Sequence, residues 1–176
     1  MKHLKVSYRT LIGLSIALIV GGCAMPPVAP PPPVWEAVSP DREAEYLPYQ
    51  EKGTGSLSGQ AFLAQKNGGV VKGAGNQVLL DPATSVGNEW WGKAGKRWVF
   101  RMLTPPSPGF AKARRTVTAD ADGKFKFTGL PAGRYFVRTE VTWDVVYIGP
   151  QGGLVGQMID IKEGENSEAI LNQMTQ

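Results

Sequence analysis

The two residue types that dominate enzyme active sites are almost missing from this chain. His3 is the only histidine and Cys23 the only cysteine among 176 residues. Both lie near the N-terminus, so a chain cleaved just before Cys23 would contain no histidine. Ser-His-Asp and Cys-His catalysis need an imidazole, and a His/Cys zinc site needs several such ligands. These classes of chemistry are therefore excluded, and a lone cysteine allows no intrachain disulfide.

Closely spaced carboxylates are the remaining candidates for acid–base or metal chemistry. Asp120 and Asp122 are separated by one residue, as are Glu163 and Glu165. Two carboxylates suffice for glycoside hydrolysis when the pKa of one of them is raised. Both pairs fall in predicted exposed turns, where nothing raises a pKa. The stretch from Asp120 also departs from a calcium loop, because its glycine stands fourth and Pro131 occupies position 12. We expect no enzyme activity, metal or cofactor.

Cys23 follows a segment with the features of a removable leader. Three basic residues precede a ten-residue apolar run at 11–20, and Val20-Gly21-Gly22 then leads into the cysteine. The apolar run is too short to cross about 30 Å of hydrocarbon as a helix. The pattern resembles a bacterial lipoprotein signal, in which the thiol receives diacylglycerol and small residues precede it for the peptidase. The alternative is an ordinary secretory peptide with a chance cysteine.

The lipoprotein resemblance implies that residues 1–22 form the signal peptide and that Cys23 carries the lipid. Two or three acyl chains are enough for stable anchoring in a membrane. Ala24 follows the cysteine, in place of the aspartate that retains lipoproteins at the inner membrane of enteric-type bacteria. The resemblance thus implies a lipid-anchored protein of the cell envelope, at the outer membrane and facing the periplasm.

The net charge argues against a nucleic-acid partner. The chain has 19 Lys and Arg against 15 Asp and Glu. Lys2, Lys5 and Arg9 belong to the predicted leader, and without them 16 basic and 15 acidic side chains remain, a net charge of +1. Nucleic-acid binders normally carry a clear basic excess. We therefore expect no nucleic acid among the partners.

Residues 23–53 have the composition of a lipid-anchored, Pro-rich linker. Six of the eight residues at 26–33 are proline, which favours an extended polyproline II spacer. The remainder is polar, with Trp35, Tyr46 and Tyr49 interspersed. A recognition motif is the alternative interpretation of the prolines.

Residues 54–172 change to short alternating runs separated by Gly, Pro and Asp, which is typical of an all-β domain. We predict seven strands, at 55–65, 77–80, 115–119, 124–127, 134–144, 156–162 and 168–171, with 173–176 as a tail. Seven strands suffice for a two-sheet sandwich. In the fourth strand, Phe125 and Phe127 are expected on the core face and Lys124 and Lys126 on the opposite face.

Residues 119–141, ADADGKFKFTGLPAGRYFVRTEV, resemble the carboxypeptidase regulatory-like domain of the prealbumin-like (transthyretin-like) sandwiches. The shared pattern is an Asp-Gly turn, an aromatic-x-aromatic strand and then L-P-x-G-x-Y-x-V. The resemblance implies a seven-stranded Greek-key β-sandwich over residues 54–172. It says little about function, because such modules serve as appendages, adhesive repeats and stand-alone lipoproteins.

Residues 85–115 exceed what a minimal sandwich needs and predict a short helical or irregular basic insertion. Seven Lys and Arg and no acidic residue lie between 91 and 119, and three of the five tryptophans lie at 90–98. The candidate partner-binding residues are Trp90, Trp91, Lys93, Lys96, Arg97, Trp98 and Arg101. Trp143 and Tyr147 are further rings that could stack on sugars. The alternative is that the charges form a solvated face and the indoles fill the core.

These observations predict a non-catalytic envelope lipoprotein that displays a β-sandwich binding or scaffolding module from the membrane. Its expected partners are the membrane, through acylated Cys23, and an envelope protein or an anionic glycan. Two alternatives remain open. One is an accessory lipoprotein of an envelope-spanning secretion or export complex, and the other is a carbohydrate-binding module for peptidoglycan or exopolysaccharide.

The lipid anchor is tested directly by the variant Cys23→Ala. Without the thiol, we expect an uncleaved or soluble precursor that no longer incorporates labelled fatty acid in growing cells. Acylation at the wild-type level in this variant would contradict the lipoprotein prediction and, with it, the predicted location.

Overall fold

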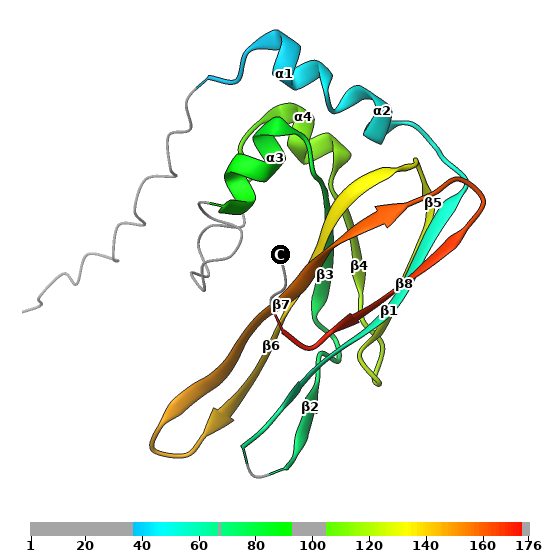
Figure 1. Cartoon of the computed structure of the whole chain (residues 1–176). Helices are drawn as coiled ribbons and strands as arrows, with labels where there is room; N and C mark the ends of the chain where they lie inside the picture. Colours follow the sequence, from blue (N-terminus) through cyan, green and yellow to red (C-terminus); the bar gives the residue numbers. More distant parts are fainter. Residues whose placement is uncertain (1–36, 67, 93–104, 174–176) are drawn as a thin grey trace, which may run out of the picture. The chain divides into compact units, whose positions relative to one another are not determined.

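The residues that the structure describes form two four-stranded sheets and four short helices. The structure is a computed structural model and describes residues 37–66, 68–92 and 105–173. In chain order the elements are α1 (Pro40–Ala44), α2 (Leu47–Gln50), β1 (Gly55–Ala64), β2 (Val70–Lys72), β3 (Gln77–Pro82), α3 (Ser85–Trp90), α4 (Pro108–Ala113), β4 (Arg115–Thr118), β5 (Lys124–Leu130), β6 (Gly133–Val145), β7 (Gly149–Ile161) and β8 (Asn166–Leu171) (Figure 1). Within the described ranges, no helix is long and apolar enough to cross a membrane.

Strand β1 pairs with the other three strands of the first sheet, and β6 pairs with two strands of the second. β1 pairs antiparallel with β5 and parallel with β8, and its C-terminal end pairs antiparallel with β2. The second sheet has the order β4-β3-β6-β7 and is antiparallel throughout. The β6–β7 pairing is the longest among the described strands and extends from Gly133↔Ile161 to Val145↔Gly149.

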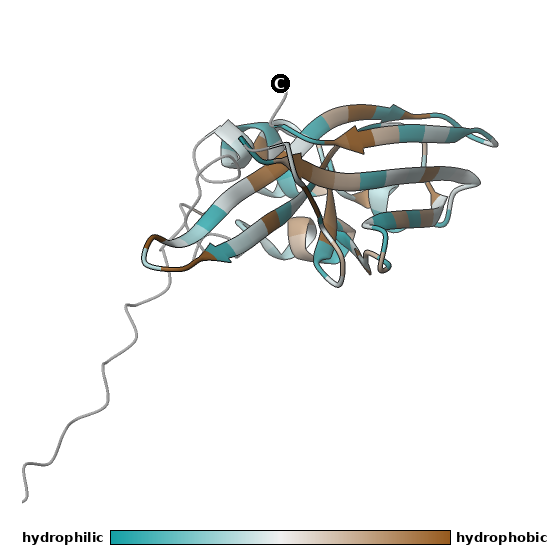
Figure 2. Cartoon of the chain, turned by 90° about the horizontal axis from the view of Figure 1, so that it is seen from below, coloured by the Kyte–Doolittle hydropathy of each residue, from teal (hydrophilic) through white to brown (hydrophobic). Residues whose placement is uncertain are grey.

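The main core lies between the two sheets, because strands of both contribute alternate apolar residues to one cluster. The members from the first sheet are Leu57, Ala61, Phe125, Phe127, Leu130, Ala169 and Leu171, and those from the second include Val78, Leu80, Tyr135, Val137, Val141, Val155 and Ile161. Figure 2 shows apolar and polar bands along the strands. The predicted two-sheet sandwich is thus confirmed, as is the phase of β5, in which the two phenylalanines are buried and the two lysines exposed.

All seven predicted strands are present, with ends shifted by a few residues, but the described chain contains eight strands. The additional strand is β2, which has three residues and pairs with the end of β1. A three-residue strand beside glycines offers too little alternation to be detected in the sequence. The largest shift is in β7, which begins at Gly149 instead of residue 156.

The Asp-Gly turn before β5 is formed as the sequence predicts. The Asp120 Oδ1 atom accepts hydrogen bonds from the backbone N–H groups of Asp122 (2.8 Å) and Lys124 (2.9 Å). Gly123 has a φ of +74°, a conformation that glycine adopts at little cost. These contacts hold the stretch as a hairpin turn.

The second sheet is covered on its outer face as well, so β6 departs from the simple alternation of buried and exposed residues. Residues 135–139 are all buried. Tyr135 and Val137 face the main core, whereas Phe136 and Arg138 face the helices. The helical side forms a second apolar cluster, whose members are Tyr46, Val86, Trp90, Trp91, Phe110, Ala113 and Phe136.

Helix α1 is attached through the first turns of two other helices. Its neighbour Glu45 accepts a hydrogen bond from the backbone N–H of Ser85 (2.7 Å), and Glu43 accepts one from that of Gly109 (2.8 Å). The bonds from Ser85 lower the pKa of Glu45. Tyr46 is fully buried between these contacts. Residues 40–50 fall within the predicted linker, yet they pack on the domain, so the packed unit begins before residue 54.

A buried ion cluster lies under the helices. The Asp81 carboxylate accepts hydrogen bonds from Nε (2.5 Å) and Nη2 (3.0 Å) of Arg114, and its Oδ2 atom lies 3.5 Å from Nε of Arg138. The Arg138 guanidinium lies 4.8 Å from the centre of the Trp90 ring and 5.7 Å from that of Trp91. Burial lowers the pKa of Arg138 to about 10, so the side chain remains charged at neutral pH.

Replacing a core phenylalanine should destabilise the sandwich far more than replacing its exposed neighbour. Phe127 is 3% exposed and Lys126 is exposed on the other face of β5. We expect Phe127→Ala to lower the free energy of unfolding by about 3–5 kcal/mol and Lys126→Ala to leave it nearly unchanged. Urea-induced unfolding of both variants measures the difference. Equal small effects would contradict the assigned face of the strand.

Removing the Asp81 carboxylate should also be strongly destabilising, because the buried guanidinium of Arg138 would then face the largely buried one of Arg114 without an acid between them. Breaking a buried ion pair in this way costs about 3–5 kcal/mol. The matched control is Asp160→Ala, since Asp160 forms a bidentate but exposed pair with Arg134 and such pairs contribute little. Equal melting temperatures for Asp81→Ala and Asp160→Ala would contradict the structural role of the cluster.

Candidate functional site

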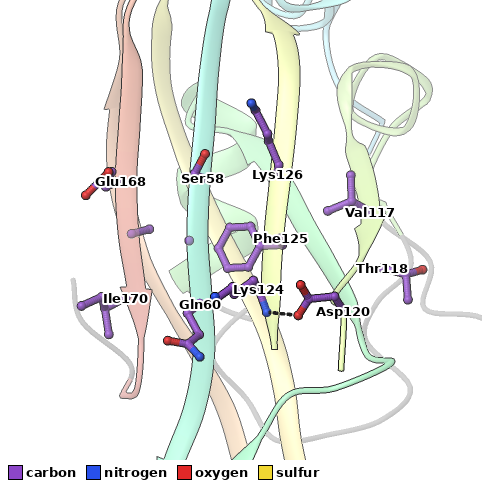
Figure 3. Close-up of a pocket in the computed structure, with 12 residues that line it drawn as sticks. Ser58, Gln60, Val117, Thr118, Asp120, Lys124, Phe125, Lys126, Glu168 and Ile170 are labelled. Atoms are coloured by element: carbon purple, nitrogen blue, oxygen red, sulfur yellow. Dashed lines mark hydrogen bonds between the residues drawn. The ribbon is translucent and has the colours of Figure 1, made fainter. Parts of the chain in front are cut away.

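The outer face of the first sheet contains an open depression of about 530 Å³, which we call the outer-face groove. Its lining comes from four strands and the turn before β5. The lining residues are Ser58, Gly59, Gln60, Val117, Thr118, Asp120, Lys124, Phe125, Lys126, Glu168, Ala169 and Ile170. Figure 3 shows β8, β1 and β5 side by side across the groove, with β4 along one edge.

The register of the strands arranges the outward side chains of the groove in two cross-strand rows. One row is Glu168, Ser58 and Lys126, and the other is Ile170, Gln60 and Lys124 (Figure 3). Directly opposed residues on one face have Cβ atoms about 4.5–5.5 Å apart. Each row therefore places β8, β1 and β5 side chains next to one another.

Local hydrogen bonds fix the central side chains of both rows. The Ser58 hydroxyl donates to Asn166 Oδ1 (3.0 Å), and the Gln60 amide nitrogen donates to the Asp122 carbonyl (2.8 Å). The Gln60 amide oxygen is not used in this bond and can accept one from a ligand. Among the ion pairs of the described residues, none involves Lys126 or Glu168.

The residues between the two rows face the main core and add no side chain to the outer surface. Gly59 and Ala169 lie between them, and a Cβ atom on Gly59 would collide with the ring of Phe125. That ring is buried in the main core. The groove thus offers hydroxyl, amide, ammonium and carboxylate groups and the apolar side chain of Ile170, which is 61% exposed. It does not offer the Phe125 ring as a stacking surface.

The tryptophans that the sequence places on a candidate contact surface are buried in the structure. Trp90 is 1% exposed and Trp91 is 3% exposed, and the Trp91 ring stacks on Phe136 with centroids 4.5 Å apart. Although adjacent, both belong to the apolar cluster on the helical side, and Arg138 lies against both rings. The alternative that these indoles fill a core is therefore correct. Lys93, Lys96, Arg97, Trp98 and Arg101 lie outside the described residues.

Part of the expected basic surface is also engaged in internal contacts. Arg114 binds Asp81 under the helices, and Arg115 Nη2 donates to the backbone carbonyls of Tyr49 (3.3 Å) and Glu51 (3.4 Å). These two arginines hold the helices against the second sheet. They contribute less to an electrostatic surface for a partner than the sequence suggests.

In each carboxylate pair, one carboxyl has a pKa below its ordinary value, which is the opposite of what a general acid needs. Lys72 forms an ion pair with Asp122 and lowers the pKa of that carboxyl. Hydrogen bonds from the hydroxyl and backbone N–H of Thr54 and from the backbone N–H of Ala132 lower the pKa of Glu163. Both carboxylates are thereby held in the charged form, as structural acceptors. Among the described residues no cluster of His, Cys, Asp or Glu could hold a metal ion.

The sequence predicts only part of the groove. It places Lys124 and Lys126 on the outer face of β5, but it does not single out Ser58, Gln60 or Glu168. Each of these polar residues alternates with a buried one along its strand, which is a detectable signal. Which strands lie next to each other is a property of the fold, and the parallel β1–β8 pairing joins residues about 110 positions apart.

The chain is similar in structure to a suggested carbohydrate-binding protein from Pseudomonas aeruginosa. The two are 27% identical with a TM-score of 0.63, and the match covers 80% of this chain and 100% of the other. The minor pilin of Streptococcus agalactiae is 14% identical with a TM-score of 0.39, covering 72% of this chain and 47% of the pilin. The major pilin subunit of Bacillus cereus is 16% identical with a TM-score of 0.38, covering 69% and 30%. No family model and no curated protein matches the chain.

The Pseudomonas similarity agrees with a β-sandwich and is compatible with a binding module. It spans the whole of that protein, so the likeness is not restricted to one hairpin or one sheet. The two pilins have TM-scores too low to carry an argument about this chain.

Proposed function

We propose that this protein is a non-catalytic glycan-binding module displayed in the cell envelope from a lipid anchor at Cys23. The observation that carries the proposal is the pair of cross-strand rows in the outer-face groove. The similarity to a suggested carbohydrate-binding protein supports it.

The chemistry of the rows suits a polyhydroxylated ligand. Sugar hydroxyls both donate and accept hydrogen bonds, and the groove provides both functions within each row: a carboxylate, a hydroxyl and an ammonium in one, an amide and an ammonium in the other. The side chains project from paired strands, which hold a binding site more rigidly than loops do. A ligand therefore meets groups whose positions are largely fixed beforehand.

The shape of the groove favours a polymer over a small free sugar. Pockets for small molecules are usually concave and bury most of the ligand, whereas this depression is shallow and open. A polysaccharide can cross such a surface and make repeated weak contacts. Peptidoglycan and exopolysaccharide are the glycans of this kind in an envelope.

The two lysines favour a glycan that carries carboxylates. Lys124 and Lys126 occupy neighbouring outward positions on β5 and are both exposed. Carboxylates on the glycan would meet these ammonium groups, while its hydroxyls meet Ser58, Gln60 and Glu168. Because the buried Phe125 is not a stacking surface, the proposed recognition depends on hydrogen bonds and charge rather than on ring stacking.

A sedimentation assay with isolated peptidoglycan sacculi and with an anionic exopolysaccharide tests the groove. Gln60→Ala with Lys126→Ala removes one group from each row. At about 0.5–1.5 kcal/mol for each hydrogen bond lost, we expect glycan binding to fall about tenfold and the melting temperature to change little. The contribution of the lysine should weaken as salt is raised, because exposed charges are screened.

The matched control for the groove is Lys112→Ala. Lys112 is an exposed lysine on α4, outside the outer-face groove, so its removal alters charge equally without changing either row. The proposal requires this variant to bind glycan like the wild type. Equal losses in both variants would indicate nonspecific charge attraction, and undiminished binding of the double variant would place the glycan elsewhere.

A further inference from the structure

The β6–β7 hairpin extends beyond the rest of its sheet. Strand β3 pairs with β6 only from Tyr135 to Arg138, whereas β6 and β7 stay paired up to Val145↔Gly149. Among the described strands, the outer part of this hairpin is thus a two-stranded ribbon, which projects from the sheet in Figure 1. Val141 and Val155 still belong to the main core, but residues 142–154 between them are exposed or half-buried, so this outer stretch needs another reason to be long.

The end of this ribbon presents three consecutive large apolar residues to solvent. Val146 is 76% exposed, Tyr147 103% and Ile148 71%. Figure 2 shows the hairpin end as an apolar patch at the extremity of two strands. Single exposed apolar residues are ordinary on protein surfaces, but a contiguous group usually marks a contact. We call residues 146–148 the apolar tip.

The backbone of the apolar tip makes these residue types more unusual. Tyr147 has a φ of +68° and is the only residue other than glycine with positive φ in the described part of the chain. Turns that need this conformation generally use Gly or Asn, because a large side chain raises its energy. Here a tyrosine flanked by β-branched residues occupies the turn, which disfavours an explanation by turn formation alone.

The surroundings of the apolar tip match a membrane interface. Residues 145–151 contain no charged side chain. Below the tip, the half-buried Trp143 lies against the ribbon, where a Cβ on Gly152 would come within 2.9 Å of the indole. Tyrosine and tryptophan combine an apolar ring with a polar atom and concentrate at the headgroup level of bilayers.

A lysine-bearing hairpin lies beside the ribbon. Strand β2 approaches β6 closely, since a Cβ on Gly73 would lie 3.3 Å from Val141 Cγ2. The hairpin of β1 and β2 carries Lys66 in its turn and the 60% exposed Val70 at the start of β2. Lysines next to exposed apolar side chains favour anionic lipid surfaces.

The size of the apolar tip distinguishes a bilayer from a protein partner. A stable protein interface buries about 800 Å² on each side, which three side chains on a narrow ribbon cannot supply. Shallow insertion into a bilayer needs no such area when a second attachment is present, because one weak membrane signal commonly supplements another. We propose that residues 146–148 insert into the headgroup region of a lipid bilayer and so orient the protein on the membrane.

This proposal rests on the proposed anchor at Cys23 only for bringing the protein close to the bilayer. The base of the hairpin is near α2, where a Cβ on Gly133 would lie 2.6 Å from the Tyr49 ring. Thirteen residues of β6 span about 40 Å from that base to the tip. The chain from Cys23 to residue 37 can reach up to about 45 Å. The linker and the hairpin are thus of comparable length, as contact of the acyl anchor and the apolar tip with one bilayer requires.

The test uses the full chain with Cys23→Ser, so that one thiol can be introduced for labelling. An NBD fluorophore is attached at Gln151→Cys, next to the unaltered tip, or at Glu165→Cys, in the turn at the other end of β7. An N-terminal hexahistidine tag takes the place of the acyl anchor and holds the proteins on phosphatidylethanolamine–phosphatidylglycerol vesicles that contain nickel-chelating lipids and nitroxide lipids. We expect NBD at residue 151 to shift to shorter wavelength and to be quenched, and NBD at residue 165 to remain unquenched.

A second variant separates the apolar tip from general membrane proximity. Val146→Ser with Ile148→Ser should reduce the quenching at residue 151 several-fold, whereas Leu47→Ser, at another exposed apolar residue, in α2, should not. Equal quenching at residues 151 and 165, or quenching unaffected by the two serines, would overturn the proposal. Tip-dependent self-association in ultracentrifugation without any quenching would also overturn it, in favour of a second copy of the chain.

The outcome is independent of the other two proposals. The quenching experiment is carried out without the thiol of Cys23, so a failure of acylation does not affect it. Binding to sacculi depends on the outer-face groove and not on residues 146–148. If the protein does not bind glycan but NBD at residue 151 is quenched, only the proposed function is contradicted. If the protein binds glycan but NBD at residue 151 is not quenched, only the membrane contact is contradicted.

Discussion

The carboxylate of Asp81 holds two arginine side chains at the place where a layer of helices covers a β-sheet. Removing charges from water is costly unless they are paired. Here the Asp81 carboxylate pairs with both guanidinium groups, and the Trp90 ring covers that of Arg138. The three charges come from β3, β6 and the end of α4. Their pairing therefore determines how α4 sits on the second sheet, and α1 in turn depends on α4 and α3 through Glu43 and Glu45.

The main core was predictable because it depends on local patterns. In β5, each phenylalanine is followed by a residue for the opposite face, and the Asp-Gly turn before it fixes where the alternation begins. Tyr135 is a similar case: its side chain enters the core, its hydroxyl donates to the Pro131 carbonyl at 2.9 Å, and burial raises its pKa. The Leu-Pro-x-Gly-x-Tyr pattern thus encodes a contact within a few residues of sequence, which explains why a short motif indicates the fold.

The helical layer was not predictable in the same way, because its contacts join distant segments. Little in the sequence around Tyr46 indicates burial, since most of the surrounding residues are polar and a proline-rich stretch precedes them. The side chain is buried by α3 and α4, which lie 40 to 65 positions later. The basic residues illustrate the same limit: charge counting treats Arg114 and Lys112 alike, but one binds a buried acid and the other is exposed. The outer-face groove was also not predictable from local patterns, because its two rows form only when β1 lies between β5 and β8.

The two sheets use their outer faces differently, and this difference leaves one face open to solvent. The outer face of the second sheet carries Phe136 and Arg138, which require cover, and the helices provide it. The outer face of the first sheet carries hydroxyl, amide and charged side chains whose interactions with water make cover unnecessary. Main-chain pairing on both sides of β1 still holds these side chains in register. A surface that is solvated and yet rigid meets the requirements for binding a hydrated polymer, because little order has to be created when the ligand arrives.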